Sequence, residues 1–461
     1  GRDISRPYDS IVQISDDGLL RSDTGDSAMT PANNLVAAID SMVQEVYQPT
    51  EPGAAIIVVK DGQVLYRRAI GLANMELGVP ITPEMIFRLG SITKQFTGVA
   101  ILLLAQQGRL ALSDPITKFL PEYPTHGHTI TIEHLLAHTS GIRSYTDMAE
   151  WQPNWRKDFT VTELIDFFKY QPMEFAPGTR WSYSNSGYHL LGAIIEQVAG
   201  QPYEQFLQQQ IFEPLGMQHT CNDSTRRIIP LRVAGYTKDG DAYVNAEYLS
   251  MTQPYAAGGL LSTVDDLAIW NAALSNNTLL PAETLKQAWI PYKLADGSST
   301  GYGYGWAMDT WQGRPTIEHG GGIHGFVTYG LRMPEDDLFI AVLSNNESIR
   351  LVEFLALKIA GLVIGAPYVQ PVAITLDVQE LAAFVGTYQL PHNQEWTITL
   401  EDGQLIGQRT HWPRISLIPI DKTAFYFEAM PLFRFVFTQG TTLELHGRSG
   451  LEETAVRSTM E

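Results

Sequence analysis

The sequence predicts an α/β domain of the α+β kind, with an antiparallel sheet flanked by helices plus a helical lobe, followed by a small antiparallel β-domain. Two observations predict this. Strand-like segments occur near both ends of residues 33–367, with helical and loop segments between them, so both ends are expected to return to one sheet. Beyond residue 371, short strand-like segments recur at spacings of roughly 8 to 12 residues, typical of a barrel or sandwich.

The N-terminal part of the chain is expected to contain a polar arm, a helix and a β-hairpin. Residues 1–32 are polar, rich in Asp, Ser and Gly, and read as an arm without periodicity. Residues 33–48 carry apolar side chains at helical spacing. Two strands are expected over 54–60 and 63–70, because Asp61-Gly62 between them is a strong hairpin signal.

The rest of the chain is expected to form further helices and strands and to be divided by a domain boundary. Helical and loop segments dominate residues 91–287, strands occupy 302–345, and a helix covers 351–364. Gly and Pro then interrupt the periodicity over 365–371, which separates a domain at 33–367 from one at 372–461. The strands expected in the second domain are 395–400, 404–408, 415–419, 424–427, 433–437 and 441–445.

Composition limits the possible partners. The 461 residues are 44% apolar and carry a net charge of −19, which argues against binding nucleic acid or an anionic membrane surface. There is no apolar run of about 18 residues, so no membrane span is expected. The single cysteine, Cys221, excludes an internal disulfide, and no Cys/His cluster has zinc spacing, so neither metal nor cofactor is expected. The Gly1 start fits a mature form after signal cleavage, a remnant of cloning or a cytoplasmic protein, and it does not choose among them; a periplasmic or secreted location is somewhat favoured.

A first motif places a hydroxyl and an amine one helical turn apart. Ser91-Ile92-Thr93-Lys94 opens an apolar helical run over 96–104, and positions i and i+3 share one helix face. A serine hydroxyl needs a neighbouring base to act as a nucleophile, and a lysine amine can serve when burial lowers its pKa. Gly90 permits the tight entry of the chain into the helix.

Two further motifs follow the first along the chain. Tyr183-Ser184-Asn185 lies in a Gly/Ser/Asn-rich loop that leads to a helix expected over 188–198, and His319-Gly320-Gly321 follows an aromatic, strand-like run. In this order the motifs resemble the pattern S-x-x-K, Y-x-N, H-x-G of the penicillin-recognising serine hydrolases, which include class C β-lactamases, penicillin-binding proteins, D-aminopeptidases and related esterases. The resemblance extends from about residue 33 to about residue 360. Residues 381–388 are similar to the opening of the lipocalin-like β-barrel appended to many relatives.

The resemblance implies roles for each motif. Ser91 would form an acyl-enzyme, with either Lys94 or Tyr183 taking its proton, and a phenolate at Tyr183 would need nearby cations such as Lys94 or a protonated His319. Asn185 would position Lys94 and the substrate. The backbone N–H groups of Ser91 and Gly322 would form the oxyanion hole, and Gly321 would let the strand approach the substrate. His319, Gly320 and Gly321 complete the expected substrate-binding set.

The third motif bears on the substrate. Its Lys-Thr form helps bind a free carboxylate, whereas His319 and Gly320 remove the hydroxyl and make the charge pH-dependent. We therefore expect cleavage of amide bonds in short D-residue peptides or amides, or carboxylesterase activity, rather than β-lactamase or D,D-carboxypeptidase as the main activity. A small molecule or short peptide is the expected partner, and a homo-oligomer is possible. An inactive sensor or scaffold of the same fold is the alternative of another class.

Several features outside these motifs have alternative interpretations. A Ser-His site is disfavoured, because no G-x-S-x-G elbow occurs and His138-Thr139-Ser140 reads as a structural turn. His324 could contact substrate or simply satisfy its own loop. The C-terminal domain is interpreted as a packing or assembly module in preference to a gate over the cleft. The cleft walls are expected from loops 145–158 and 222–253, whose aromatic residues could line an acyl pocket or pack the loops: Trp151, Trp155, Tyr236, Tyr243 and Tyr248.

Overall fold

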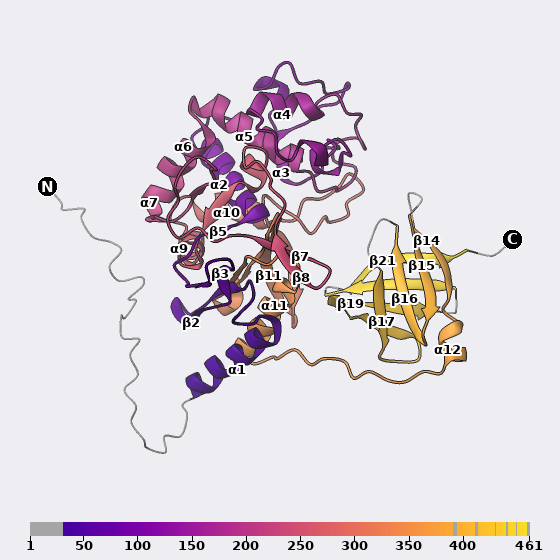
Figure 1. The fold of residues 1–461 in the computed structure, drawn as a ribbon. Helices are drawn as coiled ribbons and strands as arrows, with labels where there is room; N and C mark the ends of the chain where they lie inside the picture. The colour runs from indigo at the N-terminus through magenta and orange to yellow at the C-terminus, as the bar shows by residue number, and fades with distance from the viewer. Residues whose placement is uncertain are drawn as a thin grey trace, which may run out of the picture. The chain divides into compact units, whose positions relative to one another are not determined.

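The computed structural model describes residues 31–349, 351–390, 394–410, 414–428, 430–438, 441–448 and 450–458. These residues divide into two compact units, one extending to residue 356 and the other from residue 357 onwards, with residues 309–314 belonging to the second. Figure 1 traces the elements along the chain. The polar arm proposed for residues 1–32 lies almost wholly outside the described residues.

A six-stranded sheet has the strand order β10-β11-β12-β13-β1-β2, and most of its residues belong to the first unit. Its described pairings, from β11 through β2, are antiparallel. The early and late segments of the domain thus meet in one sheet, as expected, because β1 pairs with β13. The strands are β1 (Ala54–Lys60), β2 (Gln63–Ile70), β10 (Ala307–Trp311), β11 (Arg314–Ile323), β12 (Phe326–Met333) and β13 (Leu338–Ser344).

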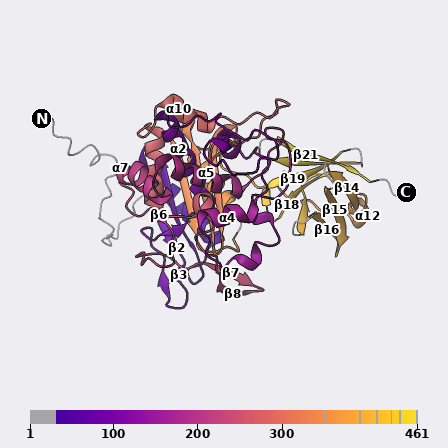
Figure 2. The same ribbon diagram turned by 90° about the horizontal axis from the view of Figure 1, so that it is seen from above.

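Most of the helices and the short strands lie between β2 and β10 in the sequence, whereas the first helix precedes the sheet and the last one follows it. Helices α2 and α5 pack against each other, and the view from above in Figure 2 shows them close together. The helices are α1 (Pro31–Val46), α2 (Thr93–Gln106), α3 (Ile132–Leu136), α4 (Val161–Phe168), α5 (Asn185–Ala199), α6 (Tyr203–Leu207), α7 (Glu213–Leu215), α8 (Tyr255–Gly258), α9 (Val264–Ser275), α10 (Ala282–Lys286) and α11 (Val352–Val363). The short strands are β3 (Leu72–Asn74), β4 (Val79–Pro80), β5 (Phe87–Arg88), β6 (Cys221–Asn222), β7 (Tyr236–Asp239), β8 (Ala242–Asn245) and β9 (Leu260–Ser262).

The second unit contains a closed eight-stranded antiparallel barrel, coloured orange to yellow in Figure 1. Its interior is filled by buried side chains, with Trp396, Phe425 and Phe435 among the largest. The expected fold class is therefore confirmed for both parts of the chain. The elements are α12 (Val378–Ala382), β14 (Gly386–Leu390), β15 (Gln394–Glu401), β16 (Gln404–Arg409), β17 (Ile415–Pro419), β18 (Ala424–Phe427), β19 (Met430–Thr438), β20 (Thr442–Gly447) and β21 (Gly450–Arg457).

Several element bounds differ from the sequence expectations for local reasons. The helix expected to begin at residue 188 begins at Asn185, because the hydroxyl of Ser184 caps it by accepting the N–H of Gly187 at 3.2 Å. Strands were expected from residue 302, yet β10 begins at Ala307. The first and last barrel strands, β14 and β21, were absent from the expected set.

Candidate active site

The site begins at the turn that carries Ser91. Gly90 has a φ of +54°, the left-handed conformation that glycine adopts without strain, and a 3₁₀ turn over Gly90–Ile92 leads directly into α2. Neighbouring strands anchor this entry. The N–H of Leu89 donates to the carbonyl of Leu260 at 2.9 Å, and the carbonyl of Leu89 accepts the hydroxyl of Thr328 at 2.7 Å. The tight entry predicted from Gly90 is therefore present.

The amine of Lys94 has three polar partners. Its Nζ lies 3.2 Å from Ser91 Oγ, 2.9 Å from Asn185 Oδ1 and 2.7 Å from the carbonyl oxygen of Ala257. The side chain is fully buried, and burial lowers the pKa of Lys94 well below its usual value. A neutral amine has two N–H donors and one lone pair. The amide and backbone oxygens can only accept, so in the neutral form of the amine the lone pair would be left for the hydroxyl of Ser91.

Asn185 is itself held from two sides. Its Nδ2 donates to Thr146 Oγ1 at 3.2 Å, and its backbone N–H donates to Ser144 Oγ at 3.0 Å. These bonds fix the side-chain oxygen that faces Lys94. The first two sequence motifs are therefore brought together, although 91 positions separate Lys94 from Asn185.

Tyr183 lies beside the same amine. Lys94 Nζ is 4.7 Å from the centroid of the Tyr183 ring. Burial raises the pKa of the Tyr183 phenol above its usual value of 10.0, and hydrogen bonding with Ser91 only partly opposes this. The phenol therefore stays protonated at neutral pH, so it is poorly suited to be the base in the resting site.

His319 is neutral in this site. Its Nδ1 lies 2.6 Å from the carbonyl oxygen of Gly320, which can only accept, so Nδ1 carries the proton and Nε2 accepts the hydroxyl of Tyr302 at 2.8 Å. Burial, and then the proximity of Lys94, lower the pKa of His319 to about 3. Near neutral pH, His319 therefore does not supply the cation that a phenolate at Tyr183 would need.

The glycines of the third motif fit close to the chain around Ser91. A Cβ on Gly321 would lie 2.0 Å from the carbonyl oxygen of Leu89 and 2.2 Å from Thr328 Oγ1. Its missing side chain thus lets β11 approach the segment before Ser91, which differs from the substrate approach expected for it. Gly322 adjoins Gly90, because a Cβ on Gly90 would lie 3.0 Å from the Gly322 nitrogen. The paired N–H donors of Ser91 and Gly322 remain a prediction.

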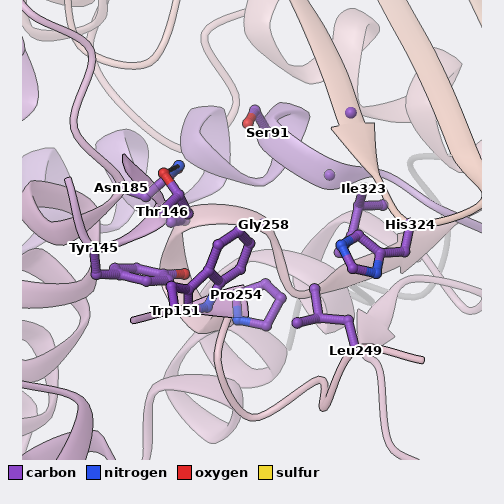
Figure 3. A pocket seen from close by; sticks show the side chains of 13 residues that line it. Ser91, Tyr145, Thr146, Trp151, Asn185, Leu249, Pro254, Gly258, Ile323 and His324 are labelled. Atoms are coloured by element: carbon purple, nitrogen blue, oxygen red, sulfur yellow. Dashed lines mark hydrogen bonds between the residues drawn. The ribbon is translucent and has the colours of Figure 1, made fainter. Parts of the chain in front are cut away.

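A cavity opens beside Ser91 and contains about 450 Å³ of empty space, part of it open solvent. Figure 3 shows Ser91 and Asn185 at its edge, with Trp151 and Leu249 among the side chains of its wall. Its lining in the described part of the chain includes no Asp, Glu, Lys or Arg. Within the described part of the chain, Lys94 and Tyr183 are not among the residues that line this cavity.

The loop aromatics separate into different environments. Trp151 lines the cavity, whereas Trp155 and Tyr248 line a different surface hollow. Tyr236 donates its hydroxyl to Glu76, and Tyr243 donates its hydroxyl to Glu51. Of the five candidates, only Trp151 lines the cavity beside Ser91.

Two histidines outside the three motifs, His138 and His324, also have defined hydrogen bonds. His138 Nδ1 accepts the N–H of Ser184 at 3.1 Å, and its ring centroid lies 4.3 Å from that of Tyr183. Its neighbour Ser140 accepts the N–H of Ile142 through Oγ at 3.2 Å. His324 lines the cavity and donates its Nδ1 proton to the carbonyl of Glu247 at 3.0 Å.

Sequence reasoning missed the groups that act through the backbone. It assigned no role to the carbonyl of Ala257, which accepts from Lys94. One side-chain bond, from the hydroxyl of Tyr302 to His319 Nε2, was missed as well. A carbonyl carries no residue-specific signal, so only the fold reveals such partners. Among the described residues, no group of acidic, His or Cys side chains could hold a metal ion, and no helix is long and apolar enough to cross a membrane.

Comparison with known proteins gives consistent results. A family model described as Beta-lactamase matches residues 37–360. Penicillin-binding protein 4* of Bacillus subtilis (strain 168) is 30% identical over 432 residues, covering 87% of this chain and 94% of that protein. The D-aminopeptidase of Gluconobacter oxydans (strain 621H) is 29% identical over 343 residues, covering 73% of this chain and 63% of that protein.

Solved structures agree on the fold. The octameric penicillin-binding protein homologue from Pyrococcus abyssi superposes with a TM-score of 0.66 at 25% identity, covering 93% of this chain and all of that one (100%). A D-stereospecific amidohydrolase from Streptomyces sp. gives a TM-score of 0.57 at 27% identity, covering 67% of this chain and 94% of the other.

Proposed function

Because this chain belongs to the β-lactamase family, whose members include serine hydrolases, we propose that it is itself a serine hydrolase that forms an acyl-enzyme through Ser91. The observation that carries the proposal is the hydrogen bonding of Lys94. Two of its three partners can only accept, which leaves the lone pair of the neutral amine for the Ser91 hydroxyl.

The reaction would proceed in two halves. As Ser91 Oγ attacks the substrate carbonyl carbon, its proton moves to Lys94 Nζ and the carbonyl oxygen becomes an oxyanion near the backbone of Ser91 and Gly322. Collapse of the tetrahedral intermediate breaks the bond to the leaving group, which takes a proton from Lys94 directly or through Tyr183. Water then attacks the acyl-enzyme, with the same groups removing its proton, and Ser91 is regenerated.

For the substrate, we propose an amide of a short D-residue peptide or amino acid. This is supported by the similarity to proteins named D-aminopeptidase and D-stereospecific amidohydrolase. A carboxylesterase is the second candidate, because the cavity lining lacks the Asp or Glu that would pair with a free α-ammonium group. The cavity lining also lacks Lys and Arg, which argues against a carboxylate as the main group by which the substrate is recognised.

Hydrolysis of p-nitrophenyl butyrate, D-Ala-p-nitroanilide and L-Ala-p-nitroanilide by the wild type and Ser91→Ala tests the proposal. Turnover of the D-anilide over the L-anilide, lost in Ser91→Ala, is the expected result for the peptidase. Ester turnover alone, equally lost, would select the carboxylesterase. Turnover that persists in Ser91→Ala would reject Ser91 as the nucleophile.

The pH dependence of kcat/KM should reflect the titration of Lys94 and not that of His319. The amine must be neutral to accept a proton, so kcat/KM should fall as pH decreases through the lowered pKa of Lys94 and level off above it. With a pKa of about 3, His319 adds no inflection near neutrality. A profile from pH 5 to 10 checks this, and His319→Gln should keep the same acidic inflection. An inflection near 6.5 that disappears in His319→Gln would contradict it.

Asn185→Asp should move that inflection. The substitution keeps the size of the side chain but places a negative charge where the neutral oxygen lies 2.9 Å from Lys94 Nζ. A nearby carboxylate favours the protonated amine, so the pKa of Lys94 should rise and kcat/KM at pH 7 should fall about 10- to 100-fold. The pH profile of the variant is the measurement. Asn276→Asp, at an exposed position after α9, is the matched control and should leave the profile unchanged.

A further inference from the structure

Gln253 lies fully buried between the two loops that form the cavity wall. Its Oε1 accepts the indole N–H of Trp151 at 2.8 Å. Its Nε2 donates to the carbonyl oxygens of Asn154 at 2.8 Å and Lys157 at 2.7 Å, with that of Trp155 at 3.3 Å. Both ends of the amide are therefore used, and all of these bonds reach one segment, residues 151–157.

Apart from Gln253, this segment is held mainly by short-range bonds. Its regular structure is a 3₁₀ turn over Gln152–Asn154, and backbone N–H groups within it donate to carbonyls three positions earlier. Ties to more distant residues include a backbone bond from Ser250 to the carbonyl of Trp155 and an exposed ion pair between Arg156 and Glu247. A loop without a ladder of its own depends on such side-chain bonds, and a buried amide left unpaired would cost about 1–3 kcal/mol. Gln253 thus bonds the backbone carbonyls of this loop, as a neighbouring strand would bond those of a strand in a sheet.

The same residue connects both aromatic walls of the cavity. Its backbone carbonyl accepts the hydroxyl of Tyr145 at 3.0 Å, while its side chain orients Trp151. Tyr145 and Trp151 both line the cavity beside Ser91, where Figure 3 shows them together. Gln253 also lies four positions before Ala257, whose carbonyl accepts from Lys94.

We propose that Gln253 is a positioning residue that fixes the Trp151 wall and so sets how large the apolar part of the substrate's acyl group can be. The inference rests on the proposed function, since an acyl group is selected only if Ser91 is acylated. The apolar surface available to such a group comes from Trp151, Leu249 and Pro254. If Trp151 is no longer held in place, the cavity should accept larger acyl groups and bind small ones less tightly.

A first test needs no activity. Arg156 and Lys157 are exposed in the segment that Gln253 holds, so limited digestion with trypsin reports its opening. Gln253→Met replaces the amide by an apolar chain of similar length and should speed cleavage after Arg156 or Lys157 by about tenfold. Trp151→Phe removes a single N–H and should give a smaller increase. Gln44→Met, at an exposed position on α1, should match the wild type.

A second test measures selectivity. The ratio of kcat/KM for p-nitrophenyl butyrate to that for p-nitrophenyl octanoate should fall about fivefold or more in Gln253→Met. A residue that only supported the fold would lower both values together and leave the ratio unchanged. An unchanged ratio in an active variant, or unchanged cleavage at residues 156–157, would overturn the inference. Wild-type turnover that does not depend on Ser91 would instead overturn the proposed function, and the digestion result would still decide whether Gln253 holds the loop.

Discussion

Replacing Lys94 by methionine is expected to lower kcat/KM for a hydrolysed ester or anilide by about 10³-fold or more, within the range for removal of a general base. Methionine keeps the length of the buried chain and removes only the amine, so the hydroxyl of Ser91 loses its proton acceptor. The oxygens of Asn185 and Ala257 lose their donor as well, which costs about 1–3 kcal/mol and is partly offset because a buried amine is no longer desolvated. Steady-state kinetics with thermal unfolding as a control measures both effects.

Lys94→Arg provides the companion variant. A guanidinium stays protonated at any accessible pH, so it cannot take the proton of Ser91, and it places a permanent charge in a fully buried position. We expect it to be as inactive as Lys94→Met and less stable. If either variant kept more than about a tenth of the wild-type kcat/KM, Lys94 would not be the base, and Tyr183 would become the candidate.

Gly321→Ala is expected to lower kcat/KM by about 100-fold, the effect of misplacing a site by about 1 Å. The added methyl would lie 2.0 Å from the carbonyl oxygen of Leu89 and 2.2 Å from Thr328 Oγ1, and no rearrangement of a flexible side chain relieves the first contact. Either β11 or the segment before Ser91 must shift. Because Gly322 adjoins Gly90, the shift separates the backbone groups predicted to form the oxyanion hole. The strain should also lower the unfolding free energy by about 1–3 kcal/mol.

The adjoining strand β12 offers a matched control for this prediction. A Cβ on Gly330 would meet only the side chain of Ile92, at 3.9 Å, which is an ordinary contact. Gly330→Ala should therefore leave kcat/KM within about twofold of the wild type. Equal losses in both variants would show that the sheet tolerates no added methyl here, and the special role given to Gly321 would be wrong.

Elements with strong local signals were predictable to the residue. The hairpin of β1 and β2 has the expected bounds, because Asp61 and Gly62 both adopt positive φ, at 53° and 69°, as its two-residue turn requires. Strand β21 was missed because most of its side chains are half-buried or exposed, so apolar and polar residues do not alternate along it. Its place in the sheet comes from closure of the barrel, which no short window of sequence can reveal.

In the candidate site, too, some features follow from the local sequence and others do not. The positions of Ser91 and Lys94 follow from one helical turn, and Asn185 could be added by resemblance. The carbonyl of Ala257, the charge state of His319 and the bonds of Gln253 depend on segments about 100 or more positions apart, such as the 102 between Trp151 and Gln253. Long-range contacts and burial determine these features, so they appear only once the chain is folded.

The most direct test of the central claim is the intact mass of the protein after treatment with a fluorophosphonate, compared between the wild type and Ser91→Ala. Such a reagent phosphonylates an activated serine and loses fluoride. The proposal predicts one adduct on the wild type, located at Ser91, and none on Ser91→Ala. An adduct that persists on Ser91→Ala would place the nucleophile elsewhere, and a wild type that takes up no reagent would favour the inactive scaffold.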